Sequence, residues 1–222
     1  MDETVIQVSS LGKRIKGKTI LEDISFEINK GDCVALIGPN GAGKTVLMSC
    51  ILGDKKPSSG QVLIDGKAGK AKNKIAVLLQ ENTIPNSLKV EELIAFFQSI
   101  SDNPLTNQEV QELLQFKEDQ YQQFADKLSG GQRRLLAFVL CLIDKPQILF
   151  LDEPTAGMDT STRQRFWEIV NDLKKAGTTI LYSSHYIEEV EHTADRILVL
   201  HQGKLIRDTT PYAMRHEEKE KQ

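Results

Sequence analysis

The 222-residue sequence has little that would indicate a membrane-spanning, secreted or strongly basic protein. It has no run approaching the roughly 18–20 apolar residues that a helix needs to cross a bilayer. Its first residues lack the basic and then apolar blocks of a secretory signal peptide, so we expect the chain to stay where it is made. Its formal charge is −3, so no overall positive field favours nucleic acid as a partner.

Cysteine is also scarce. Cys33, Cys50 and Cys141 stand singly within apolar segments, without the spacing of a metal site. We therefore expect buried thiols in a reducing compartment rather than disulfides. The whole sequence is 40% hydrophobic and 27% charged, the composition of an ordinary globular domain that is long enough to bury a substantial core.

The hydrophobic pattern predicts an α/β fold, because short β-branched runs alternate with longer segments of helical period. Residues 4–8 and 24–28 alternate with a period of two and predict an N-terminal antiparallel β flank, with residues 11–19 as a loop between them. Continuous apolar runs that end in polar residues predict a mostly parallel central sheet with both faces covered. These runs are residues 33–38, 74–79, 147–152, 178–184 and 196–201.

The hydrophobic periodicity changes in the middle of the chain. Helical periodicity replaces strand signals there and predicts a helical subdomain at about residues 85–140. We expect one domain over residues 1–222, with its core in 1–84 and 141–211 and a charged C-terminal tail over 212–222. The mixed charges of residues 216–222 predict a solvated, fraying end.

A phosphate-binding pattern, G-x-x-x-x-G-K-S/T, lies between an apolar strand and a helical segment, which is the context that this chemistry needs. Its glycines let backbone N–H groups surround phosphate oxygens, while the positive end of the helix dipole and a lysine add charge. The alternative is a glycine-rich turn that only links a strand to a helix. The pattern comprises Gly38, Pro39, Asn40, Gly41, Ala42, Gly43, Lys44 and Thr45, whose hydroxyl is expected on Mg²⁺.

A second apolar strand, within residues 147–154, carries two carboxylates at its end. Asp152 is placed to hold Mg²⁺ through water, and Glu153 to orient or deprotonate an attacking water molecule. The alternative for Glu153 is an ordinary solvated glutamate. With the phosphate loop, these carboxylates predict a phosphohydrolase that acts on a magnesium nucleotide.

A third motif, LSGGQ, lies just before this strand: Leu128, Ser129, Gly130, Gly131 and Gln132. Alone it reads as a helix cap, since Ser129 precedes an apolar-periodic segment. Together with the phosphate loop and the strand carboxylates, it resembles the signature motif of the ATP-binding cassette (ABC) family. The resemblance runs from about Val5 to Pro211. It implies a P-loop NTPase core in which LSGGQ contacts the γ-phosphate of ATP bound by another subunit.

Other family positions follow by resemblance. Gln80 matches the Q-loop glutamine, which is implied to sense Mg²⁺ and the attacking water and to pass movement to a membrane partner. Asp159 stands at the D-loop, implied to contact the other subunit, and His185 matches the switch histidine that contacts the γ-phosphate. The implied catalytic residues are thus Glu153, His185 and Gln80, and the implied metal-site residues are Thr45, Gln80 and Asp152.

Two departures from the family pattern concern nucleotide binding. Ile15 stands where the family usually has an aromatic residue that stacks on adenine, so we expect weaker affinity or base selectivity. Ile20 is placed to add an apolar contact to the base or ribose. Val46 replaces the common serine or threonine after Thr45 and offers only its backbone N–H to phosphate.

The resemblance implies an ATPase, with ATP and Mg²⁺ as cofactors, that acts as a homodimer or as a heterodimer with a second ABC ATPase subunit. Integral-membrane permease subunits are the implied partners, and no nucleic acid is expected. Residues 81–97 are the candidate docking segment, with Leu93, Ile94, Phe96 and Phe97 either docking or packing in the core. The pattern resembles a bacterial exporter of drugs, peptides or lipid-like compounds, cytoplasmic and peripheral on the inner face of the cell membrane.

A soluble ABC ATPase of translation, repair or cofactor assembly is the competing class. Such proteins usually carry two cassettes or a long coiled coil, and neither is present in the sequence. A third possibility is a nucleotide-responsive module that does not turn over. A module of this kind would lack one or more of the residues needed for hydrolysis, so the presence of Glu153 and His185 argues against this possibility.

Overall fold

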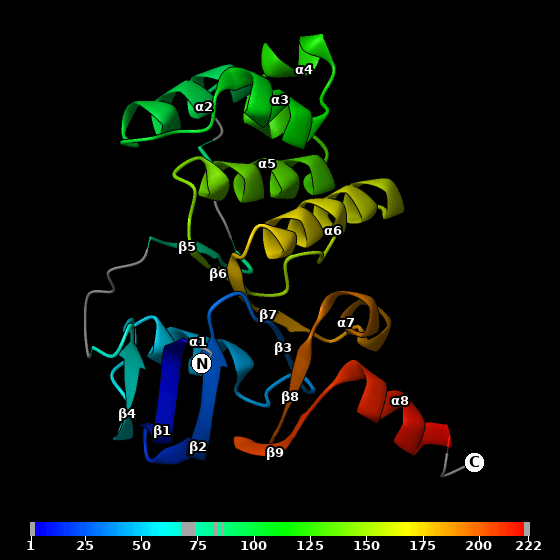
Figure 1. Cartoon of the computed structure of the whole chain (residues 1–222). Helices are drawn as coiled ribbons and strands as arrows, with labels where there is room; N and C mark the ends of the chain where they lie inside the picture. The colour runs from blue at the N-terminus through cyan, green and yellow to red at the C-terminus, as the bar shows by residue number, and fades with distance from the viewer. Residues whose placement is uncertain (1–2, 68–73, 82–83, 86, 220–222) are drawn as a thin grey trace.

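The computed structural model describes residues 3–67, 74–81, 84–85 and 87–219. Figure 1 shows two sheets toward one end of the molecule and a group of helices at the other. The smaller sheet is antiparallel, with the order β2-β1-β4. It is formed by β1 (Thr4–Ile15), β2 (Lys18–Asn29) and β4 (Ser59–Ile64).

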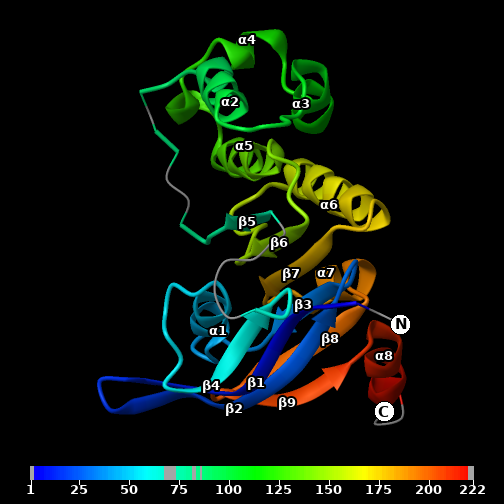
Figure 2. The ribbon, with the colours of Figure 1, turned by 60° about the vertical axis from the view of Figure 1, so that its left-hand side comes forward.

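The prediction of a loop over residues 11–19 is wrong, because β1 and β2 continue through it as one long hairpin (Figure 2). Ile15 pairs with Lys18, and the two residues between them, Lys16 and Gly17, both have positive φ, 47° and 80°. Two successive positive φ values give the twist of a tight two-residue hairpin turn. The glycine- and lysine-rich sequence is therefore the end of a hairpin rather than a connecting loop.

The larger sheet has six strands in the order β5-β6-β7-β3-β8-β9. All the central strands expected from the apolar runs are present, and they pair in parallel. They are β3 (Cys33–Ile37), β5 (Ile75–Leu78), β6 (Ile148–Leu151), β7 (Thr179–Ser184) and β8 (Arg196–His201). An antiparallel edge strand that the sequence did not predict, β9 (Lys204–Thr209), completes the sheet.

Alternation along β3 divides the core between the two faces of this sheet. Val34 and Leu36 pack toward the small sheet and α1 (Lys44–Ile51), which lies between the sheets. Cys33 and Ala35 pack in a second cluster on the opposite face, with α6 (Thr160–Lys175) and α7 (Ile187–Thr193). Both faces of the sheet are covered, as its continuous apolar strands require.

The helical group contains α2 (Val90–Ser99), α3 (Asn107–Leu114), the short α4 (Glu118–Tyr121), a 3-10 turn (Ala125–Lys127) and α5 (Gly130–Leu142). Leu93 and Ile94 are buried in the core, whereas Phe96 is 55% exposed. The apolar face of α2 is therefore mainly a packing face. Of the candidate docking segment, Asn82, Thr83 and Asn86 lie outside the described residues.

The segment predicted as a charged tail begins as a helix, α8 (Pro211–Lys219), in which the rings of Tyr212 and His216 lie 4.3 Å apart. Residues 220–222 lie outside the described residues. Among the helices of the described residues, none has the length and apolar character to cross a membrane.

Candidate active site

The predicted site residues follow the carboxyl ends of four parallel strands. Gln80 comes after β5, Asp152 and Glu153 after β6, His185 after β7, and the phosphate loop after β3. Because β5, β6, β7 and β3 are neighbours in this order, their carboxyl ends meet at one edge of the sheet. The fold thus assembles residues from Gly38 to His185 at one place, where open parallel sheets bind ligands.

The phosphate loop passes too close to its neighbours for side chains at two glycines. A Cβ at Gly38 would lie 2.1 Å from the carbonyl oxygen of Leu200, and one at Gly43 would lie 2.7 Å from a methyl carbon of Leu21. Gly43 also has a φ of 106° and immediately precedes α1. The two glycines therefore allow the loop to pass close to Leu200 and Leu21 before α1 begins.

Lys44 is buried, with 6% of its side chain exposed, and it folds back over the loop. Its ammonium group donates to the carbonyl oxygens of Gly38 at 2.7 Å and Pro39 at 3.3 Å. It also lies 4.0 Å from a carboxylate oxygen of Glu153. The cation is thus held at the mouth of the loop.

Asp152 is held by hydroxyl groups on both of its oxygens. Thr45 donates to Oδ2 at 2.8 Å from the start of α1, and Ser183 donates to Oδ1 at 2.5 Å from β7. Ser183 also accepts the backbone N–H of Glu153 at 2.8 Å. Two strands and a helix therefore fix the orientation of this buried carboxylate.

Three polar side chains of the site surround the carboxylate of Glu153. Its Oε2 accepts the side-chain amide of Gln80 at 3.3 Å and lies 3.5 Å from Nδ1 of His185, while its Oε1 faces Lys44. Its φ of 44° is in the left-handed region, which a residue with a side chain occupies at a cost of about 1–2 kcal/mol. Only 14% of the side chain is exposed, so this strained glutamate is not an ordinary solvated one.

These residues fit a magnesium nucleotide chemically. The backbone N–H groups at the start of α1 and the Lys44 ammonium form a cationic cradle of the kind that binds phosphate. The Thr45 hydroxyl and the Asp152 carboxylate, 2.8 Å apart, are the hard oxygen ligands that Mg²⁺ takes. Beside them, the Glu153 carboxylate is available to accept a proton.

The residues predicted to contact the base lie on and near the hairpin. Ile20, half-buried, packs with Val46 against the core around α1, and its carbonyl oxygen would lie 3.3 Å from a Cβ at Gly43. This part of β2 therefore borders the phosphate loop. Ile15, also half-buried, lies next to the turn of the hairpin, where it pairs with Lys18.

The LSGGQ residues form a separate group around the start of α5. Ser129 caps the helix, since its hydroxyl accepts the N–H of Gln132 at 3.2 Å, and the Gln132 amide oxygen accepts the N–H of Ser129 at 3.1 Å. Gly131 lies against the D-loop, where a Cβ would be 3.2 Å from Oδ2 of Asp159. Across the described residues, no hydrogen bond or ion pair joins this group to the phosphate loop.

Asp159 and His185 are linked to their surroundings by different contacts. Asp159 caps α6, and hydrogen bonds from Ser161 and Thr162 hold the pKa of its carboxyl well below the usual range. The ring of His185 lies 4.0 Å from that of Tyr186, over which the guanidinium carbon of Arg163 lies at 5.4 Å. Arg163 also donates to the carbonyl oxygen of Met158 in the D-loop at 3.4 Å.

Several residues of the site were not predicted. Ser183 is the partner of Asp152, and its only sequence signal is a polar residue near the end of an apolar strand. Arg163 and Tyr186 link the D-loop to the histidine, and Arg134 contacts the chain after β5 and β6. Ser183 and Arg134 bind groups that are distant in sequence, and Arg134 binds only backbone atoms, so no local pattern marks these two residues.

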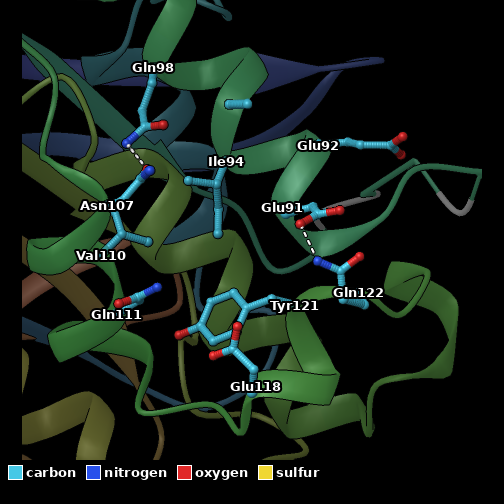
Figure 3. Close-up of a pocket in the computed structure, with 11 residues that line it drawn as sticks. Glu91, Glu92, Ile94, Gln98, Asn107, Val110, Gln111, Glu118, Tyr121 and Gln122 are labelled. Carbon is cyan, nitrogen blue, oxygen red and sulfur yellow. Dashed lines mark hydrogen bonds between the residues drawn. The ribbon is translucent and has the colours of Figure 1, made fainter.

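A further groove, of about 420 Å³, lies in the helical group between α2, α3 and α4 (Figure 3). Glu91, Glu118 and Tyr121 are on its wall, and the Gln122 amide donates to Glu91 at 2.5 Å. None of the predicted site residues lines it. Its acidic groups already bond within the wall or face solvent, so we assign it no role in the chemistry.

Comparison with known proteins agrees with this geometry. The family model described as ABC transporter matches residues 21–156. The linearmycin resistance ATP-binding protein LnrL of Bacillus subtilis is 34% identical over 213 residues, covering 91% of this chain and 68% of that protein. Nod factor export ATP-binding protein I of Rhizobium johnstonii is 33% identical over 228 residues, covering 98% of this chain and 73% of that protein.

Solved structures show the same fold. An ATP-binding subunit of an ABC transporter superposes with a TM-score of 0.83 at 26% identity, covering 97% of this chain and 93% of that chain. A bacterial Atm1-family ABC exporter with ATP bound also gives 0.83, at 23% identity, and covers 97% of this chain and 40% of that chain; this likeness concerns the fold alone. The predicted α/β P-loop fold and the family resemblance are both confirmed.

Proposed function

Because this chain belongs to the ABC transporter family as an ATP-binding protein, we propose that residues 1–222 act as one ATPase domain that dimerises around two Mg-ATP. In this proposal the chain drives transport through separate membrane subunits. The convergence of Lys44, Gln80 and His185 on the carboxylate of Glu153 carries the proposal. In this proposal the strained and shielded Glu153 carboxylate, beside the phosphate loop, acts as the base.

In the proposed reaction, ATP lies with its phosphates in the loop of residues 38–45. Lys44 turns from the carbonyl oxygens of its own loop to the terminal phosphates, which leaves the Glu153 carboxylate free to accept a proton from the attacking water. Gln80 orients this water, and His185 contacts the γ-phosphate from the end of β7. Both side chains already lie beside Glu153.

Mg²⁺, when bound, would neutralise phosphate charge. Thr45 and Asp152 would hold it, with Gln80 as a further oxygen ligand. Ser183 keeps the Asp152 carboxylate oriented toward Thr45 throughout. In this proposal Asp152 binds the metal ion and Glu153 accepts the proton.

We place the second contact to each ATP on the partner subunit. Ser129, Gly130 and Gly131 lie at a helix N-terminus, which attracts phosphate, but they make no bond to the phosphate loop of their own chain among the described residues. Asp159 is exposed beside Gly131 and would cross the interface with it. Either two copies of this chain or a related pair satisfies this arrangement.

Membership of the family supports a proposal for the class of partner and for the location. We propose integral-membrane permease subunits as partners, a peripheral position on the inner face of the cell membrane, and export of a drug, peptide or lipid-like compound. Similarity to a linearmycin resistance protein and to Nod factor export proteins supports the export direction. A soluble role in translation, repair or cofactor assembly would instead give partners other than membrane proteins.

Replacement of Glu153 tests the proposal. We expect Glu153→Gln to bind ATP but to lower turnover by about 100-fold or more, because the amide cannot accept the proton. Light scattering should then find a dimer with Mg-ATP and a monomer without nucleotide. Glu27→Gln is the control, since Glu27 is a surface carboxylate on β2 that bonds to Gln7, and it should leave turnover unchanged.

Two outcomes would contradict the proposal. A Glu153→Gln protein that hydrolyses ATP like the wild type would refute the role of the base. A Glu153→Gln protein that stays monomeric with saturating Mg-ATP would refute the shared sites, even if hydrolysis is lost.

A further inference from the structure

Arg134 lies in α5, close behind the LSGGQ residues, and its guanidinium points away from the helix toward the sheet edge. It donates to backbone carbonyl oxygens on two segments that are remote from each other in sequence. At the end of β5 it contacts Leu79 and, at 2.9 Å, Gln80. After β6 it contacts Asp152 at 3.0 Å, Glu153 at 3.5 Å and Pro154 at 3.1 Å.

This set of contacts suits an arginine in particular. A planar guanidinium carries five N–H donors in a fixed fork, so one side chain can bind several carbonyl oxygens with defined directions. Burial lowers the pKa of the Arg134 guanidinium and the charge of Asp152 opposes this, yet an arginine keeps its charge in proteins. The cation therefore ties the two chain segments together without dependence on its own protonation.

The two segments are the ones that carry the proposed catalytic groups. Gln80 follows β5 and Glu153 follows β6, and their side chains meet at 3.3 Å. A backbone hydrogen bond from the Asp152 N–H to the carbonyl oxygen of Leu78, at 2.8 Å, joins the two segments where the strands end. Gln80 and Glu153 lie just beyond this bond, where Arg134 contacts the backbone of both.

We propose that Arg134 is a positioning residue for hydrolysis, which sets the backbone of Gln80 and of Glu153 relative to helix α5. Ser129 and Gln132 cap the same helix, so a shift at its N-terminus is transmitted to the base through one side chain. The inference rests on the proposed function of Glu153. It adds a link, within one chain, between the LSGGQ helix and the water-activating residues.

Steady-state hydrolysis by the purified chain, titrated with Mg-ATP, tests this role. For Arg134→Met we expect kcat to fall by about 20-fold or more with the KM for ATP within about threefold, because the phosphate loop is unchanged. Arg134→Lys keeps the charge but not the fork. It should fold as the wild type and still lose about fivefold or more in kcat.

Arg165 provides a matched control. It too is an arginine that donates to backbone carbonyl oxygens, those of Leu113 at 3.0 Å and Glu112 at 2.6 Å, but it ties α6 to α3 away from the site. Arg165→Met should lower the thermal midpoint without changing kcat. A purely structural role of Arg134 would give this same result.

The outcomes separate the inference from the proposed function. A folded Arg134→Met protein with kcat near the wild-type value, or an Arg134→Lys protein as fast as the wild type, would overturn the inference. So would an equal loss of kcat in Arg165→Met. If Glu153→Gln hydrolyses ATP normally in the same assay, the proposed function has failed instead.

Discussion

Glu153 shows how one residue can depend on several parts of the chain. Its carboxylate faces a lysine from α1, a glutamine after β5 and a histidine after β7. Its backbone N–H bonds to Ser183, and its left-handed φ of 44° costs free energy that these contacts must offset. Substitution of any one neighbour should therefore change the position of the Glu153 carboxylate.

Ile15 gives a prediction for nucleotide affinity. If its side chain faces the base, Ile15→Tyr should tighten ATP binding by about fivefold or more, since stacking on an aromatic ring contributes about 1–3 kcal/mol. Titration calorimetry with ATP measures this, with Ile15→Leu as the control for side-chain size. Unchanged or weaker binding in the tyrosine variant would mean that residue 15 does not contact the base.

At the residue scale, the sequence identified the groups that have a local motif. Lys44, Thr45, Asp152 and Glu153 lie in short patterns that follow apolar strands, and the structure places them together. Ser183 and Arg134 were missed for a physical reason. Arg134 binds carbonyl oxygens, which every residue has, so the identity of its partners leaves no trace in the sequence.

Among the elements, strands that are buried on both faces gave the clearest sequence signal. β3, β6 and β7 are buried throughout and appear as continuous apolar runs. The edge strands β4 and β9 are half exposed and rich in polar residues, so neither a run nor a clear alternation marks them. The order of strands within the sheet is likewise set by long-range pairing, which no local pattern contains.

Two helix caps of the same geometry allow stability and function to be separated. Ser129 and Thr106 each accept the N–H three residues later at 3.2 Å, at the starts of α5 and α3. Ser129→Ala and Thr106→Ala should each lower the free energy of unfolding by about 1 kcal/mol, because each leaves an N–H without its cap. Urea unfolding measures both losses.

Hydrolysis should distinguish these two variants. We expect Ser129→Ala to lower turnover by about tenfold or more through loss of the proposed contact to the partner's γ-phosphate, and Thr106→Ala to leave it unchanged. Equal turnover in the two variants would show that Ser129 acts only as a cap.

The stability of the whole molecule should depend on alkaline pH through Cys33, in the middle of the central sheet. Burial raises the pKa of its thiol to about 12. The folded state therefore keeps a proton that the unfolded chain loses, so this contribution is full below the ordinary thiol pKa and declines as the pH rises toward the folded value.

Between pH 8 and 10, the wild type should lose about 1.5 kcal/mol more of its unfolding free energy than Cys33→Ala. Urea unfolding of both proteins at the two pH values measures this difference, and the other buried ionisable groups, present in both, cancel. Parallel losses in the two proteins would mean that the Cys33 thiol does not titrate with unfolding.

The position of β3 at the centre of the sheet also has a consequence for synthesis. Its neighbours are β7 and β8, and Cys33 pairs with Ile180. On a ribosome that adds about 5–20 residues per second, β3 emerges roughly 7–30 s before β7, the first of the two strands that it pairs with. The nascent chain must therefore carry a fully apolar strand without partners for that time, while the β1–β2 hairpin, which is local, can already form.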